Sequence, residues 1–371
     1  MDSRWIFDRA LISVFLGALF ISGALAVARS PGELLPAEYR RPASPPKLSR
    51  HLGAMKRFPA ACEAYFSDRL PWRERLLTSR ADCEVNGFGV SSSDKVILGR
   101  DGWLFLDEKK EEGVGQPRDP AEQCRQWLTA FRRRQAWCAT RGIDYVLLPT
   151  PEKQAIYPEF LPTAWQHLRA PTAADRLVAL LRADGDLCFV DLEPALRTAK
   201  SGGQVYFRTD THWNERGGLI SYRACGPALG FQPMNEDAFT SVPRTLLGDL
   251  NRMLCLSHPP GEPFEQITVR APQARRRSAE PVQGPSVADN VERVWETGDK
   301  RLRRAVIFHD SYAKVAMLQA LAEHFETLAA VPTLSFEEEV VARFQPDVVV
   351  QQFALRRING MAPPEAAKPK D

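Results

Sequence analysis

The sequence predicts an α/β protein with a mostly parallel sheet and helices on both faces. Amphipathic helical segments alternate along the chain with short apolar runs, as expected where each pair of parallel strands is joined by a helix. The apolar runs are continuous rather than alternating with polar residues, which is typical of strands buried on both sides. These runs lie at 143–148, 187–192, 305–308 and 347–351.

The composition is that of a folded body without a nucleic-acid partner. Hydrophobic residues make up 44% and charged residues 26% of the 371 residues, and the formal net charge is only +3. A chain of this length can bury a large core, and we expect one main domain. The arginine runs at 132–134 and 275–277 fall on the polar side of a helix and in a polar loop, so we interpret them as solvated surface.

Residues 1–29 predict an N-terminal membrane anchor or a signal peptide. The segment from Ala10 to Val27 carries no charge and is long enough to cross a bilayer as a slightly short transmembrane helix. Residues 24–26 resemble a cleavage site, but an apolar core of this length is more typical of an uncleaved anchor. We therefore expect an exported body tethered to a membrane.

The rest of the chain divides by composition into a linker, one domain and a tail. Residues 30–50 are rich in proline and charge and predict an extended linker, and 51–360 form the main domain. Within this domain, 257–301 has only short apolar runs, so we expect a polar insertion or long loop there. The polar residues 361–371 predict a disordered tail. Seven cysteines permit disulfides in an exported chain, but no CxxC pair or metal-ligand spacing occurs.

Local signals predict the remaining elements. A helical stretch over 57–77 is interrupted at Pro71, and two short strands within 96–106 flank a Gly-Arg-Asp-Gly turn. Asp119 as N-cap, followed by a proline, begins a helix over 120–141. A further strand is expected at 205–207, and further helices at 173–183, 215–229 and 312–325.

One candidate site follows the expected strand 205–207. Asp210 and His212 are two positions apart, and side chains two apart on extended backbone project to the same side. A carboxylate that accepts the Nδ1–H of an imidazole fixes its tautomer and leaves Nε2 able to take a proton. Depending on the turn, Asp210 or a third group supplies this carboxylate. The pair suits a general base.

The second candidate is Ser311, which follows the apolar strand 305–308 directly before a predicted helix. Open α/β sheets place their sites at the carboxyl ends of strands, and the unpaired amides of a first helical turn can bind an oxyanion. Ser311 is therefore a candidate nucleophile with His212 as its base. A plainer alternative is that the Asp-Ser pair only caps the helix. Another is a metal site formed by the cluster Asp210, His212, His309 and Asp310.

Several motifs together carry a family resemblance that spans most of the chain. They are 65–73 (YFSDRLPWR), 102–105 (GWLF), 149–153 (PTPEK), 156–159 (IYPE), 161–162 (LP), 209–214 (TDTHWN), 248–250 (GDL), 309–312 (HDSY) and 345–349 (QPDVV). In this order and spacing they resemble the AlgJ/AlgX group of bacterial polysaccharide O-acetyltransferases, which have an SGNH-hydrolase-like domain.

The resemblance implies a flavodoxin-like SGNH domain in which Asp210, His212 and Ser311 form the catalytic triad and Ser311 becomes acetylated. Because the aspartate and histidine precede the serine, the triad order looks like the circularly permuted arrangement of the AlgX-like domain. The sequence departs from the family at 351–353, where Gln-Gln-Phe stands in place of an expected acidic residue. Candidates for lining the substrate cleft are Lys153, Tyr157 and Trp213, although packing of the two aromatic residues is an equal alternative.

The resemblance also implies a function and partners. The enzyme would move acetyl groups onto hydroxyls of an exported polysaccharide, alginate or another exopolysaccharide, in the periplasm. The acetyl group would come from a membrane-bound O-acyltransferase, residues 10–27 would hold the chain at the inner membrane, and no metal or organic cofactor is required. Two alternatives are a periplasmic carbohydrate acetyl esterase with the same triad and a non-catalytic scaffold of a polysaccharide secretion complex.

Overall fold

The computed structural model divides the chain into two compact units. The first comprises Met1–Ser93 with Asn251–Pro260, and the second comprises Asp94–Leu250 with Gly261–Asp371. Most of the expected linker and the whole expected tail lie outside the described residues. The residues that the structure describes are 3–28, 35, 40–47, 52–107, 119–167, 172–277 and 293–358.

The first unit contains the candidate membrane span. Within α1 (Ser3–Ala28), residues 7–28 have a mean hydropathy of 2.4, and among the described residues this is the one helix long and apolar enough to cross a membrane. The next helices are α2 (Leu52–Ser67), α3 (Arg73–Asp82) and a π-helical turn, η1 (Cys83–Gly87). The chain therefore leaves the helical conformation around Pro71, as predicted.

Asp68 has a structural role at this break. Its carboxylate accepts hydrogen bonds from two nitrogens of Arg40, at 2.6 and 2.8 Å, and from the amide of Ala43 at 2.7 Å. The hydrogen bond from Arg40 is the main reason why the pKa of Asp68 is lowered. The YFSDRLPWR motif thus fixes the chain that precedes α2 inside the first unit.

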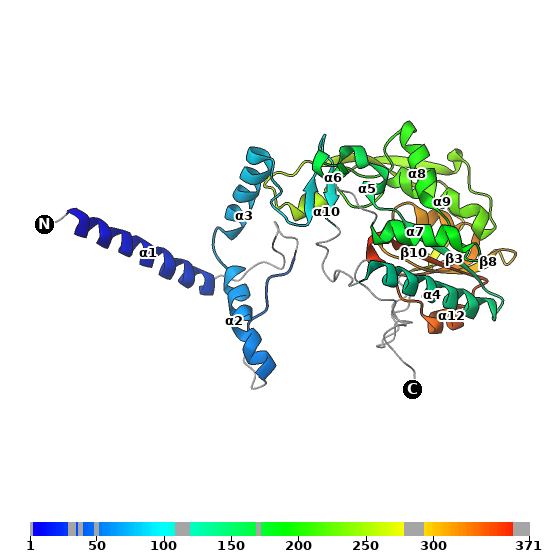
Figure 1. The fold of residues 1–371 in the computed structure, drawn as a ribbon, viewed down its shortest axis with the longest axis horizontal. Helices are drawn as coiled ribbons and strands as arrows, with labels where there is room; N and C mark the ends of the chain where they lie inside the picture. Colours follow the sequence, from blue (N-terminus) through cyan, green and yellow to red (C-terminus); the bar gives the residue numbers. More distant parts are fainter. Residues whose placement is uncertain are drawn as a thin grey trace. The chain divides into compact units, whose positions relative to one another are not determined.

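A six-stranded mixed sheet forms the centre of the second unit, in the order β3-β10-β8-β9-β7-β6 (Figure 1). The first four strands are parallel, whereas β7 and β6 are antiparallel to their neighbours. The expected mostly parallel sheet is therefore mixed, with a parallel centre and an antiparallel edge. The strands are β3 (Asp144–Thr150), β10 (Val348–Ala354), β8 (Arg303–Phe308), β9 (Phe325–Val331), β7 (Arg293–Glu296) and β6 (Arg275–Arg277).

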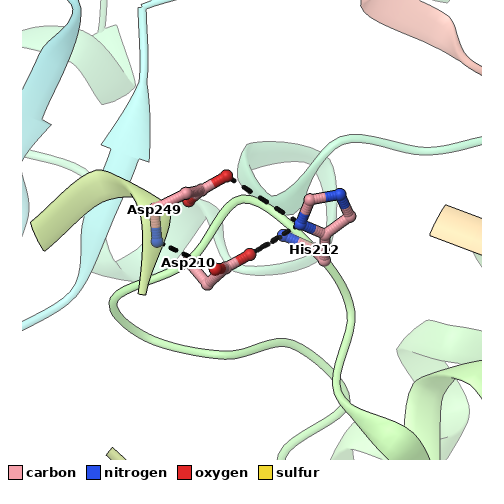
Figure 2. Close-up of side chains that lie close together, drawn as sticks. All are labelled: Asp210, His212 and Asp249. Atoms are coloured by element: carbon pink, nitrogen blue, oxygen red, sulfur yellow. Dashed lines mark hydrogen bonds and ion pairs between the residues drawn. The ribbon is translucent and has the colours of Figure 1, made fainter. Parts of the chain in front are cut away.

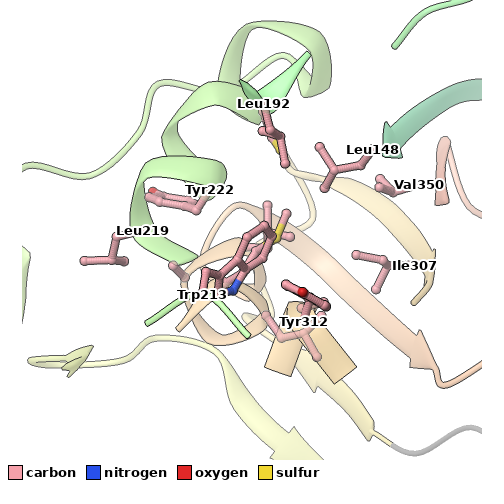
Figure 3. Packing of buried hydrophobic residues seen from close by; sticks show 14 of the residues in the cluster. Leu148, Leu192, Trp213, Leu219, Tyr222, Ile307, Tyr312 and Val350 are labelled. Carbon is pink, nitrogen blue, oxygen red and sulfur yellow. The ribbon is translucent and has the colours of Figure 1, made fainter. Parts of the chain in front are cut away.

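Helices cover both faces of this sheet, as the sequence predicts. On one face lie α4 (Pro120–Ala139), α7 (Ala173–Asp184) and α12 (Glu338–Phe344), and on the other lie α8 (Leu192–Ala199), α9 (Glu215–Leu229) and α11 (Met317–Ala322) (Figure 1). Ile307 of β8 packs with the second group, whereas its neighbours Val306 and Phe308 pack with the first. Figure 3 shows the second face, where Ile307 and Val350 of the sheet lie near Leu192 of α8.

The α4 helix illustrates how local signals set an element. The Asp119 carboxylate accepts from the amides of Ala121 and Glu122, at 2.9 and 3.2 Å, and so caps the first turn. Beyond the last turn, Gly142 has a φ of +69°, which a residue with a Cβ rarely adopts. The start of α4 is as predicted, and its last residue precedes the expected end by two positions.

Short elements complete the second unit. Two antiparallel ribbons are formed by β1 (Val96–Leu98) with β2 (Leu104–Leu106), as predicted, and by β4 (Phe239–Leu246) with β5 (Glu262–Val269). The remaining α-helical turns are α5 (Lys153–Ile156), α6 (Thr163–His167) and the start of α10 (Asp249–Met253), whose last three residues belong to the first unit. The 3₁₀ turns are η3 (Pro158–Phe160), η4 (Lys200–Gly202), η5 (Glu236–Ala238), η7 (Ser311–Lys314) and η8 (Leu355–Ile358).

Three expectations about elements are wrong. Ala316 has a φ of +55°, so the expected helix 312–325 is interrupted, and its end is the start of β9. The apolar runs 187–192 and 205–207 make single bridges instead of strands. In 257–301, β5, β6 and β7 lie where a polar insertion or long loop was expected. The sequence did not mark these strands, because many of their residues are solvent-exposed and carry no apolar pattern. Residues 278–292 lie outside the described part.

Candidate active site

Residues 205–214, the histidine loop, form a tight turn instead of a strand. Tyr206 and Trp213 make an antiparallel bridge, the amide of Phe207 donates to the carbonyl of His212 at 3.2 Å, and the amide of Asn214 donates to Val205 at 3.1 Å. The loop therefore folds back on itself between the buried Val205 and Asn214, the N-cap of α9. Its middle residues, which include Asp210 and His212, lie at the turn.

Asp210 and His212 are in direct contact within this loop. Asp210 Oδ1 lies 2.6 Å from His212 Nδ1 and also accepts from the His212 amide at 3.0 Å. The side chains meet because the carboxylate closes a short turn onto the backbone two residues later, not because they alternate along a strand. With Asp210 accepting, the proton of the neutral imidazole is assigned to Nδ1, and Nε2 is an acceptor.

Ser311 reaches the other nitrogen of the same imidazole. It stands at the start of η7, three residues after the carboxyl end of β8, and its side chain is exposed. Its Oγ lies 2.6 Å from His212 Nε2, although the two residues are 99 positions apart in the chain. The structure thus brings Asp210, His212 and Ser311 into one hydrogen-bonded chain, in the geometry in which an imidazole can take the proton of an alcohol.

Asp310 supplies the cap at this turn. Its carboxylate accepts from the amide of Tyr312 at 3.0 Å, from the amide of Ala354 at 2.6 Å and from Gln352 Nε2 at 2.9 Å. The capping alternative therefore applies to Asp310, while Ser311 faces His212. Gln352, within the segment 351–353 where an acidic residue was expected, fits this environment because its amide can donate to the Asp310 carboxylate and a carboxylate cannot.

The electrostatics of the loop favour a charged imidazole. Burial alone would lower the pKa of His212, but the hydrogen bond and the negative charge of Asp210, with a further contribution from Asp249, raise it. Burial also disfavours the charged form of Asp210, yet its hydrogen bond with His212 holds its pKa below the ordinary value. The imidazole is therefore a stronger base than an ordinary histidine.

The metal alternative does not fit the distances. The described residues include one cluster with ligand atoms close enough for an ion, formed by Asp210, His212 and Asp249, and it contains neither His309 nor Asp310. Within it, the 2.6 Å between Asp210 Oδ1 and His212 Nδ1 is a hydrogen-bond distance. Two ligands of one zinc ion, each about 2.0–2.1 Å from the metal, stand roughly 3 Å or more apart.

Comparison with known proteins assigns the family. The model of the family described as "SGNH hydrolase-like domain, acetyltransferase AlgX" matches residues 96–288 of this chain, more than half of its length. The chain belongs to this family. The matched segment contains β3 and β6 of the six-stranded sheet, whereas the other four strands and Ser311 follow it in the chain.

Sequence relatives include proteins named "Probable alginate O-acetylase AlgJ". The protein of Pseudomonas aeruginosa is 30% identical over 192 residues, covering 50% of this chain and 46% of the relative. That of Pseudomonas fluorescens is 28% identical over 238 residues, covering 57% and 55%. The chain thus spans about half the length of the curated relatives it matches.

Two solved structures share the fold. The O-acetyltransferase domain of Pseudomonas putida AlgJ has a TM-score of 0.51 and 20% identity, over 74% of this chain and 96% of that domain. Bacillus cereus PatB1 has a TM-score of 0.54 and 15% identity, over 72% of this chain and 98% of that chain. At these identities the similarity concerns the fold alone.

The residues expected to line a substrate cleft are buried in this AlgX-type domain. Lys153, Tyr157 and Trp213 are 2%, 3% and 0% exposed, and no ligand can touch them without displacing the protein around them. Both aromatic rings pack in the core, as the packing alternative has it, and Figure 3 shows Trp213 beside Tyr312. The expectation that these side chains line a cleft is wrong. For the two aromatic residues the reason is that burying their apolar surface is favourable.

Lys153 instead supports the histidine loop. Its Nζ donates to the carbonyls of Phe207, Arg208 and Asp210, at 3.0, 3.0 and 2.7 Å. These three acceptors use all three N–H groups of an ammonium. Burial lowers the pKa of Lys153 to about 7, against the nearby carboxylates of Asp249 and Asp210, which raise it.

Sequence reasoning missed several residues around the candidate site. Glu262 accepts from the amides of Arg208 and Thr209, at 2.8 and 2.9 Å, and Asp249 accepts from the amide of Thr211 at 2.7 Å. Asp249 stood in the GDL motif, so a signal for it existed. Glu262 lay in the segment expected to be a loop, and no local pattern marked it.

A pocket of about 450 Å³ lies beside the N-terminal half of α9 and β5. Phe207 and Asn214 of the histidine loop contribute to its wall, together with Glu215 and Phe264. None of Asp210, His212 and Ser311 lines it, so this pocket is distinct from the hydrogen-bonded chain described above.

Proposed function

We propose that this chain is an O-acetyltransferase in which Ser311 is the nucleophile, His212 the general base and acid, and Asp210 the group that orients His212. The observation that carries the proposal is the pair of 2.6 Å contacts on the two nitrogens of one imidazole, to Ser311 Oγ and to Asp210 Oδ1. The raised pKa of His212 and the exposed position of Ser311 support it. The order of the triad in the chain agrees with a circularly permuted SGNH arrangement.

The proposed reaction has two transfers. In the first, His212 Nε2 takes the proton of Ser311, whose Oγ attacks the acetyl carbonyl carbon, and the donor's leaving group departs with that proton. In the second, a sugar hydroxyl gives its proton to His212 and attacks the acetyl-serine. Ser311 Oγ leaves and takes the proton back. Asp210 stays ionised and stabilises the imidazolium in both steps.

The names of the relatives support the proposed acceptor, and the acetyl donor and the location are proposed along with it. The AlgJ proteins are named as probable alginate O-acetylases, which supports alginate or another exported polysaccharide as acceptor. We propose a membrane-bound O-acyltransferase as the source of acetyl, and a periplasmic location in which residues 10–27 hold the chain at the inner membrane. The apolar helix α1 supports this last point by its length and composition.

The test uses the full-length chain in detergent with a chromogenic acetyl ester, with and without an oligosaccharide acceptor, and mass spectrometry to follow acetyl. We expect acetyl on Ser311 and then on sugar hydroxyls, and a loss of at least about 10³-fold in Ser311→Ala. Acetyl released only to water identifies an esterase. Equal activity of Ser311→Ala and the unmodified protein rejects the proposal.

A further inference from the structure

We propose that Asp249 is a second carboxylate partner of His212, which positions Asp210 and takes over the support of the imidazole when the charge of Asp210 is lost. The inference rests on the proposed role of Ser311 and His212. Figure 2 shows the three side chains, with Asp210 and Asp249 facing the same nitrogen of His212.

Asp249 holds both residues that precede His212. Its backbone amide donates to Asp210 Oδ2 at 2.9 Å, which leaves Asp210 Oδ1 to the imidazole. Its carboxylate accepts from the amide of Thr211 at 2.7 Å and from the Thr211 hydroxyl at 2.6 Å. Asp249 therefore fixes the Asp-x-His turn from outside the histidine loop.

The preceding glycine makes this approach possible. A Cβ at Gly248 would lie 2.0 Å from the carbonyl oxygen of Thr209, a distance that no side chain tolerates. Only glycine lets the segment carrying Asp249 pass so close to the histidine loop. In the GDL motif, the glycine therefore permits the close approach and the aspartate makes the hydrogen bonds to the histidine loop.

The second carboxylate is close enough to replace the first. Asp249 Oδ2 lies 3.9 Å from His212 Nδ1, against 2.6 Å for Asp210 Oδ1. The single Nδ1–H can be donated fully to one of them, and Asp210 has it. A movement of roughly 1 Å, at the expense of the Thr211 hydroxyl bond, would bring Asp249 within hydrogen-bond range.

The charges around the imidazole support this assignment. Asp210 and Asp249 are the anions near it, Arg356 is the cation whose charge opposes its protonation, and Lys153 is the cation near both carboxylates. Burial and the negative charge of Asp210 raise the pKa of Asp249. Removal of either carboxylate charge should therefore lower the pKa of His212 and move the acid limb of the pH–rate profile to lower pH.

The experiment is a double-mutant cycle on the full-length chain, read as kcat/KM for a chromogenic acetyl ester between pH 5 and 9. The variants are Asp210→Asn, Asp249→Asn and both together. Asp191→Asn is the matched control, since this aspartate, like Asp249, accepts a backbone amide, here that of Glu193 at the start of α8, and its second donor is Arg182. Thr211→Val removes the hydroxyl that donates to Asp249 and lies 3.3 Å from His212 Nδ1, without changing charge, and melting curves establish that each variant is folded.

We expect Asp210→Asn to lose about 10²-fold, less than the roughly 10⁴-fold known where a triad has a single carboxylate, and the double variant to fall to about 10⁴-fold. Asp249→Asn alone should lose about tenfold and shift the acid limb to lower pH. The inference is overturned if Asp249→Asn lowers kcat/KM by the same factor in the wild-type protein and in the Asp210→Asn variant. The inference is also overturned if Thr211→Val shows the same rate loss and the same shift of the acid limb as Asp249→Asn. If Ser311→Ala keeps full activity, the proposed function itself fails, whatever the carboxylate variants do.

Discussion

The phenol of Tyr312 donates a hydrogen bond to the carbonyl of Thr211 at 2.8 Å, so the residue after Ser311 is joined to the residue before His212. Tyr312 is fully buried, and its oxygen also contacts Arg356, which forms a buried ion pair with Glu152 at 2.8 Å. This bond sets the distance between two segments that lie about a hundred positions apart in the chain.

Tyr312→Phe should therefore lower activity more than its effect on stability suggests. The variant keeps the ring but leaves the Thr211 carbonyl without this donor, which costs about 1 kcal/mol of unfolding free energy. A shift of Ser311 relative to His212 should reduce kcat/KM about tenfold, because proton transfer depends on that distance. Denaturant unfolding and ester turnover measure the two effects.

The matched control is Tyr222→Phe. Its phenol lies 2.6 Å from His324 Nε2 in the same hydrophobic core, away from the histidine loop. It should lose similar stability and keep its activity. If both phenylalanine variants lose activity equally, Tyr312 has no special role in alignment.

Lys153→Met should uncouple the histidine loop from α5. The substitution leaves three carbonyls of the loop without their ammonium donor and should cost about 3 kcal/mol of unfolding free energy. Activity should fall with it, in kcat rather than KM, because Lys153 holds the base and does not reach the surface.

The comparison for this variant is Lys200→Met. Lys200 Nζ also donates to a carbonyl, that of Ile156 at 2.9 Å, and it pairs with Glu159. Its side chain is partly exposed, and neither of these two partners belongs to the histidine loop. A small loss of stability with full activity is expected. An active Lys153→Met protein with ordinary stability would contradict the role described here.

The convergence of His212 and Ser311 was predictable because each belongs to a local pattern. Ser311 follows the apolar strand β8, whose carboxyl end points in the same direction as those of its parallel neighbours. His212 stands two positions after an aspartate. The fold class was predictable for the same reason, since buried parallel strands and amphipathic helices leave continuous and periodic patterns.

Residues that act on the loop from a distance were not predictable. Asp249 reaches Thr211 from 38 positions away and Glu262 reaches Thr209 from 53, and neither contact follows from spacing. The broken helix after Ser311 was missed because Ala316, a good helix former, takes a left-handed φ that nothing in its local sequence indicates. Lys153 was misjudged because a lysine is usually at the surface, whereas here three carbonyls compensate its burial.

Gly248→Ala should damage the site through backbone displacement. The added methyl would meet the Thr209 carbonyl oxygen at 2.0 Å, so either the histidine loop or the segment with Asp249 must move. We expect a loss of about 2 kcal/mol in unfolding free energy and a large fall in kcat/KM. Gly53→Ala is the control, since nothing lies within 4 Å of its Cβ position in α2, and it should be neutral or slightly stabilising.

Glu215 should make stability depend on pH in the neutral range. It stands at the first position of α9 beside the pocket, and burial raises its pKa from 4.5 to about 7, against a backbone hydrogen bond with Ile267 that lowers it. Between these two pKa values the folded protein holds a proton that the unfolded chain has released. Its contribution to stability is therefore lost as the pH rises from 4.5 to about 7, by up to about 3 kcal/mol.

Glu215→Gln removes this titration and should raise the melting temperature at pH 8.5 but not at pH 4.5, where the wild-type carboxyl is protonated in the folded state. Because the favourable interaction of a carboxylate with the start of α9 is lost as well, the gain at pH 8.5 will be smaller than the full shift. Glu122→Gln removes an exposed carboxylate from the first turn of α4 and controls for that loss. A Glu215→Gln protein less stable than wild type at pH 8.5 would mean that the carboxylate is well solvated in the pocket.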